Sequence, residues 1–238
     1  MNKAHFIENF RMAFGNYELP VVFWYSDAAE NLPTKTKGCF IGDLKRARKG
    51  TVVSLNVETI SCLGGKLYTG FTPVPTFIRT FVSTKELYKA SPEMVDSFIT
   101  DLNISSKTGR YINFVSIDKI ENFDNIEGLV FFAIPDVLSG LISWTFFDTN
   151  APDAVSLPFG SGCSSIIAQT VAENQNNGYR SFLGMFDPSA RPEVESNILT
   201  LSVPMSRFKE MYYTFEKSCL SGTRDWKKVK DRIINDGN

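Results

Sequence analysis

The sequence predicts an α/β or α+β protein, in which a mixed β-sheet is flanked by helices in a single compact domain. Short runs rich in β-branched and aromatic residues alternate along the chain with segments whose apolar residues recur at helical spacing. The 238 residues contain no internal repeat and no linker-like stretch, so we expect one domain over residues 1–238. Within it, we expect an N-terminal helix in residues 1–15 and a helical tail in residues 223–238.

The predicted strands are short apolar runs bounded by polar, glycine or proline residues. The first begins at Pro20, and the second follows Gly50 and is rich in β-branched residues. The expected strands are 20–25, 51–60, 111–117, 129–134, 154–157, 181–186 and 198–203.

The predicted helices rest on apolar spacing, capping residues and glycine stops. Phe6, Phe10 and Phe14 recur every four residues and Gly15 follows them, which is typical of an amphipathic helix that ends at glycine. Pro92 stands where the first turn of a helix tolerates proline. The expected helices are 1–15, 44–49, 83–90, 92–102, 135–147, 163–174, 208–222 and 224–234.

The overall charge argues against two classes of partner. Lysine and arginine number 25 and aspartate and glutamate number 26, so a broad phosphate-binding surface, and with it a nucleic-acid partner, is not expected. No stretch approaches ~20 consecutive apolar residues, so we expect no membrane partner. The first residues lack the apolar core of a signal peptide, which predicts a cytoplasmic location and reduced cysteines.

Three of the four cysteines lie beside glycines, at boundaries between predicted elements. Glycine permits left-handed backbone and a close approach of a ligand or of another chain segment. Loops held by a rigid scaffold are also where binding residues concentrate, so the three thiols could meet in space. The three segments are Gly38-Cys39, Cys62-Leu63-Gly64-Gly65 and Gly160-Ser161-Gly162-Cys163.

The first functional hypothesis is a small-molecule or metal site that gathers Cys39, Cys62 and Cys163. Thiolates suit an iron–sulfur cluster or another soft metal. The chain has no Cys-x-x-Cys pair, and Cys219 falls on the apolar face of a predicted helix. The alternative is that the cysteines are ordinary core residues, since cysteine is among the most buried residue types.

The second hypothesis is a thiol-dependent enzyme with Cys163 as its catalytic residue. Cys163 begins a predicted helix, and the unpaired N–H groups at such an end lower the pKa of a thiol. The turn before it could instead hold a carboxylate or phosphate. Packing is the competing interpretation, because Cys163 shares a helical face with Ile166 and Ile167. The only histidine is His5, so a Cys–His mechanism is not expected.

A small-molecule ligand is expected where glycine lets the backbone approach closely. The segment 187–192 could add Asp187 and Arg191 to such a site, although segments of this composition are most often turns. The candidate ligand-binding residues are Gly64, Gly65, Gly160, Gly162 and Arg191.

The aromatic content supports a third hypothesis, a non-catalytic binding or assembly protein with purely structural cysteines. Aromatic residues make up 13% of the chain, which includes 20 phenylalanines. Such side chains could line a pocket or the interface of a homodimer.

Six short segments, taken in order, resemble a known family of uncharacterised proteins. They are 20–22, 47–50, 61–65, 160–164, 187–191 and 201–204. The chain is similar through them to domain of unknown function 169, also called the ArCR family, over roughly residues 15–220. The resemblance implies a bacterial or archaeal cytoplasmic protein without an established reaction. It also implies that Cys39, Cys62 and Cys163, and not Cys219, are the recurrent cysteines.

Overall fold

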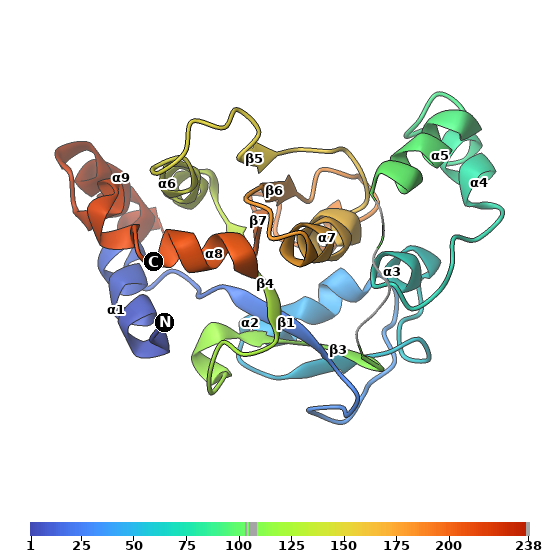
Figure 1. Cartoon of the computed structure of the whole chain (residues 1–238), viewed down its shortest axis with the longest axis horizontal. Coiled ribbons are helices and arrows are strands. Elements are labelled where there is room, and N and C mark those ends of the chain that lie inside the picture. Colours follow the sequence, from blue (N-terminus) through green and yellow to red (C-terminus); the bar gives the residue numbers. More distant parts are fainter. Residues whose placement is uncertain (103, 105–108, 237–238) are drawn as a thin grey trace.

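The computed structural model describes residues 1–102, 104 and 109–236, and its described strands form one mixed sheet (Figure 1). The strand order is β2-β3-β1-β4-β7-β6-β5. All neighbours pair antiparallel except β5 and β6, which are parallel. The strands are β1 (Val21–Ser26), β2 (Val53–Leu55), β3 (Tyr111–Ser116), β4 (Ile126–Ala133), β5 (Val155–Ser156), β6 (Ser181–Gly184) and β7 (Leu199–Pro204).

The sheet is buried on both faces because its central strands are apolar at successive positions. In β1, Val22 faces one hydrophobic core while Val21 and Phe23 face another. In the neighbouring β4, Phe131 and Phe132 divide between the two cores in the same way. The result is an α+β domain with helices on both sides of the sheet, as the sequence predicts.

Four helices pack over the first core, and they include the first and the last described helix. Phe6, Phe10 and Phe14 pack into it from the first helix, and Trp226 packs into it from the last. These helices are α1 (Lys3–Phe14), α6 (Pro135–Thr145), α8 (Met205–Tyr212) and α9 (Arg224–Asp236). Of the ranges expected for the two terminal helices, α1 covers residues 3–14 and α9 covers residues 224–236, with residues 237 and 238 outside the described residues.

The second core lies on the other face and carries the cysteine-bearing segments. It is covered by a 3-10 turn (Phe40–Asp43), α2 (Leu44–Arg48), a π-helical turn (Ser164–Ala168) and α7 (Gln169–Gln175). The short α3 (Leu63–Tyr68) lies beside them. Two further helices, α4 (Ile78–Thr84) and α5 (Pro92–Asp101), pack on each other and project from one end of the molecule (Figure 1).

Several predicted boundaries were wrong, for local reasons. The strand predicted over 51–60 ends at Leu55, because the Asn56 side chain accepts hydrogen bonds from the N–H groups of Glu58 and Thr59 and closes a turn. The helix predicted over 208–222 ends at Tyr212 and continues only as two 3-10 turns. The helix α3 was not predicted, because Gly64-Gly65 is typical of a turn.

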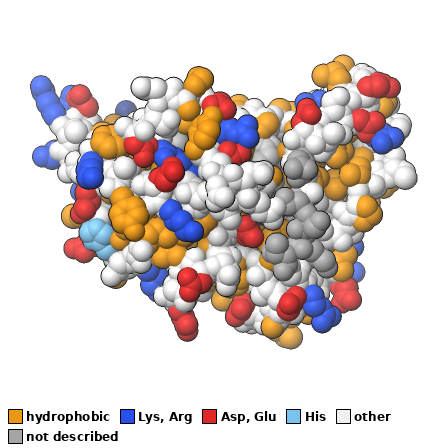
Figure 2. Space-filling model, in the orientation of Figure 1, with side chains coloured by type: hydrophobic (Ala, Val, Ile, Leu, Met, Phe, Trp, Pro, Cys, Tyr) orange, Lys and Arg blue, Asp and Glu red, His pale blue; other side chains and the backbone are white. Residues whose placement is uncertain are grey.

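The surface carries acidic and basic side chains interspersed on the face that Figure 2 shows, over α8 and around the projecting α4–α5 pair. Hydrophobic side chains are visible on the flank of that pair. Among the described residues, no helix combines the length and the apolar character needed to span a membrane.

Candidate functional site

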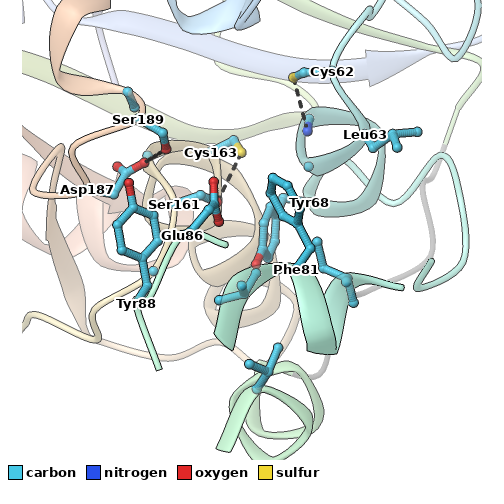
Figure 3. A pocket seen from close by; sticks show the side chains of 18 of the residues that line it. Cys62, Leu63, Tyr68, Phe81, Glu86, Tyr88, Ser161, Cys163, Asp187 and Ser189 are labelled. Atoms are coloured by element: carbon cyan, nitrogen blue, oxygen red, sulfur yellow. Dashed lines mark hydrogen bonds between the residues drawn. The ribbon is translucent and has the colours of Figure 1, made fainter. Parts of the chain in front are cut away.

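A cavity of about 480 Å³ lies where the cysteine-bearing segments meet α4 and α5. Its volume is in the usual range for small-molecule sites. Figure 3 shows Cys62 and Cys163 toward the sheet and Phe81, on α4, opposite them. Cys39, Cys62 and Cys163 all line this one cavity, as do the predicted ligand-binding residues Gly64, Gly65, Gly160 and Gly162.

Cys62 is positioned by the start of α3, where it is the N-cap residue. Its Sγ accepts a hydrogen bond from the N–H of Gly65 at 3.3 Å (Figure 3). A hydrogen bond from the thiol of Cys39 lowers the pKa of Cys62 to about 6. Backbone N–H groups, including that of Gly65, act in the same direction. Both influences favour the thiolate form of Cys62, and this residue is only half-buried.

Cys39 lies immediately before the 3-10 turn that begins at Phe40. Its pKa is raised, because its thiol donates to the Cys62 sulfur and because it is partly buried. Cys39 therefore keeps its proton and acts as a hydrogen-bond donor. The pair divides the roles of thiolate and thiol, although both residues are the same amino acid.

Cys163 lies at the start of the π-helical turn and is buried. Its Sγ is 3.3 Å from the Oγ of Ser161 (Figure 3). Burial raises its pKa to about 12, with smaller contributions from Cys62 and Asp187. The effect of the backbone N–H groups that should activate this thiol is thus outweighed by desolvation, and Cys163 is a poorer nucleophile than Cys62.

Two glycines are required by the close approach of other groups. A Cβ on Gly65 would lie 2.7 Å from Cys62 Sγ and 2.9 Å from atoms of Ile60 and Phe40. A Cβ on Gly162 would lie 2.7 Å from the sulfur of Met185. These glycines let the backbone pack against the cysteine side of the cavity.

The opposite wall is aromatic and comes largely from α4 and α5. Phe77, Phe81 and Phe159 are exposed to 47%, 42% and 39%, which is unusual for phenylalanine. The rings of Tyr88 and Phe159 meet edge to face at 6.0 Å. The high phenylalanine content favours a pocket but does not identify these residues. They come together only in the folded chain, from segments that are distant in sequence.

One end of the cavity is acidic. Asp187, in the loop after β6, is 1% exposed, and its Oδ2 accepts a hydrogen bond from Ser189 at 2.7 Å. Burial raises the pKa of Glu86, and the nearby Asp187 raises it further. Arg191 does not join them: its guanidinium donates to backbone carbonyls of Met185, Ser196 and Ile198, and it does not line the cavity.

The remaining sequence-predicted groups lie elsewhere or give no metal site. Cys219 is outside the cavity and packs against the first core. His5 is on α1, hydrogen-bonded to Asn9. In the part of the chain that the structure describes, no group of three or more His, Cys, Asp and Glu side chains could hold a metal ion. The iron–sulfur hypothesis gains no support from this geometry.

Comparisons with known proteins give one finding. A family model described as Uncharacterised ArCR, domain of unknown function 169, matches residues 10–213. The match includes all the cavity residues named above and ends near the last residue of α8. No curated protein and no solved structure matches the chain.

Proposed function

We propose that this chain, which belongs to the uncharacterised ArCR family, binds an apolar small molecule in the cavity and reacts with it through the Cys62 thiolate. One observation carries the proposal. The Cys62 sulfur lies on the wall of the cavity and accepts a hydrogen bond from Gly65 N–H, so that a nucleophile and a binding volume coincide.

The surroundings of Cys62 favour chemistry over packing. A reactive cysteine has a lowered pKa and is partly exposed, whereas a structural cysteine is buried and inert. Cys62 has the first set of properties and Cys163 the second. We therefore propose Cys62 as the nucleophile, in place of Cys163, which the sequence predicted. Cys163 is a buried residue in the lining of the cavity.

The aromatic wall supports a ligand with an apolar body. Exposed phenylalanines around a concave site are typical of small-molecule binding. The third hypothesis, binding without reaction, shares this wall and differs only in the role of Cys62. The reactivity of Cys62 distinguishes the two.

The experiment is a pH profile of alkylation. The native protein is treated with iodoacetamide from about pH 5 to about pH 9, and each labelled cysteine is identified by mass spectrometry. Because thiolates are the reactive form, the Cys62 rate should reach half of its plateau near pH 6. An ordinary thiol reaches that point near pH 8.5.

Two variants serve as controls. Cys39→Ala removes the thiol that donates to Cys62 and should move the half-plateau upward by about one pH unit or more. Cys219→Ser, which lies outside the cavity, should leave the Cys62 profile unchanged. The proposal fails if native Cys62 reacts no faster than Cys219 near neutral pH.

The cytoplasmic location and the homodimer stay predictions. All four cysteines are free, which suits a reducing compartment. Fractionation of the source cells and sedimentation of the purified protein test these two predictions separately.

A further inference from the structure

The acidic end of the cavity indicates the class of ligand, a conclusion that rests on the proposed function. Asp187 is almost completely buried, at 1% exposure, and lines the cavity. Its Oδ2 has the hydroxyl of Ser189 as a partner. Its Oδ1 has no hydrogen-bond partner among the described residues. A buried carboxylate oxygen without a donor is costly, so such an atom calls for a ligand or a water.

A second carboxyl group faces the same space. Glu86 lies just after α4 and lines the cavity, and Asp187 is close enough to raise its pKa. Figure 3 shows Glu86 and Asp187 on the same side of the view, with the hydroxyl of Tyr88 directed toward Asp187. Two carboxyl groups from separate segments of the chain thus converge on one end of an otherwise apolar cavity.

The nearby basic side chains do not neutralise this end. Within the described residues, neither Asp187 nor Glu86 takes part in an ion pair within 4.0 Å. Arg191 is held by backbone carbonyls. Lys89 lines the cavity, but its Nζ lies over the ring of Phe98, 5.1 Å from the centroid.

We propose that the acidic end binds a cationic nitrogen, and that the ligand is an amphipathic amine whose apolar body lies along the aromatic wall. A primary ammonium group supplies the donor that Asp187 Oδ1 lacks and the positive charge that two converging carboxyl groups favour. The apolar part contacts Phe77, Phe81 and Phe159. A carboxylate or phosphate ligand would meet repulsion at the same position.

The test compares three ligands with the same alkyl chain: n-octylamine, n-octanol and octanoate. Binding to the full-length protein is measured by isothermal titration calorimetry near neutral pH. We expect the amine to bind at least about tenfold more tightly than the alcohol, because a charge-assisted hydrogen bond is stronger than a neutral one. Octanoate should bind more weakly than the alcohol.

The matched variants separate charge from shape. Asp187→Asn keeps the side-chain size but loses the charge, and it should reduce the preference for amine over alcohol to less than about twofold. The affinity for octanol should stay as it is in the wild-type protein. Glu86→Gln should lower the same preference by a smaller factor, and it provides the result if Asp187→Asn does not fold. Glu127→Gln is the control, since Glu127 is a part-buried carboxyl that pairs with Asn174 outside the cavity.

The outcomes distinguish this inference from the proposed function. If octanol binds and octylamine binds no better, the cavity proposal stands and the amine proposal is overturned. If the amine preference survives both Asp187→Asn and Glu86→Gln, the carboxyl groups do not cause it, and the proposal is again overturned. If none of the three molecules binds, the binding of apolar ligands in the cavity fails together with this inference.

Discussion

A few neighbours decide the chemistry of each cysteine. The thiol of Cys39 and the N–H of Gly65 stabilise a thiolate at Cys62, whereas burial keeps Cys163 protonated. Cys39 lies close to Cys62 in space but 23 positions before it in the sequence. That is why glycine spacing could predict which cysteines meet, but not which of them is activated.

The residue-scale prediction compares two adjacent glycines of α3. Gly65→Ala should destabilise the protein by about 1–3 kcal/mol, because the new Cβ would overlap Cys62 Sγ, Ile60 and Phe40. In Gly64→Ala, the nearest atom to the new Cβ is on Tyr68, at 4.0 Å. This variant should be neutral or more stable by about 0.5–1 kcal/mol, since alanine is the better helix former. Urea unfolding followed by circular dichroism measures both, and equal stabilities would contradict the packing described here.

At the scale of elements, the strands were easier to predict than the helices around the cavity. Each expected strand is found, because apolar runs of strand length are a local signal. The helix expected over 83–90 was wrong: α4 ends at Thr84, and Leu87 has a positive φ of 57°. The contact between the rings of Tyr88 and Phe159 accompanies this bend, and it depends on residues 71 positions apart in sequence.

The π-helical turn at Ser164–Ala168 was also not predictable as such. The spacing of Ile166 and Ile167 predicts a helical face, and both residues are indeed buried in the second core. The wider turn is a rearrangement of backbone hydrogen bonds, to which apolar spacing is insensitive. Such turns occur often beside functional sites, and this one adjoins Cys163.

The element-scale prediction concerns the docking of α9. Trp226 packs edge to face on Phe14, with ring centroids 5.3 Å apart, and its indole N–H donates to the carbonyl of Ala13 at 3.1 Å. Trp226→Ala should therefore cost about 3–5 kcal/mol in the free energy of unfolding. Lys227→Ala, on the exposed side of the same helix, should change it by less than about 0.5 kcal/mol. The measurement is chemical denaturation, and a small effect of Trp226→Ala would mean that α9 is dispensable for the first core.

At the scale of the whole molecule, the sheet separates two hydrophobic cores. The first contains side chains of α1 and α9, and the second adjoins the cavity. Cys163 belongs to the second core, together with side chains from β1, β3 and β4. Successive apolar residues in the central strands favour a sheet that is buried on both faces. This pattern does not predict which face carries the cavity, because that depends on how α4 and α5 fold back on the cysteine segments.

The whole-molecule prediction uses Cys163 as a reporter of global unfolding. Its thiol is buried and its pKa is raised to about 12, so iodoacetamide should label it only when the second core opens. The urea concentration at half-labelling should match the midpoint of unfolding seen by circular dichroism. Labelling of Cys163 well below that midpoint would show that the cavity lining around it opens separately.

The segment that contains Cys62 and the helices α3 to α5 connects β2 to β3, and these two strands pair directly with each other. The chain therefore leaves the sheet after Leu55 and returns to it at Tyr111, beside the strand that it left. Phe77 and Phe81 of the aromatic wall belong to this excursion, whereas Phe159, Cys39 and Cys163 lie outside it. Residues 71–102, which include α4 and α5, lie within this excursion. Replacing residues 71–102 with the equivalent stretch of another family member should therefore change the apolar contacts of a ligand, while Asp187 and the three thiols stay where they are.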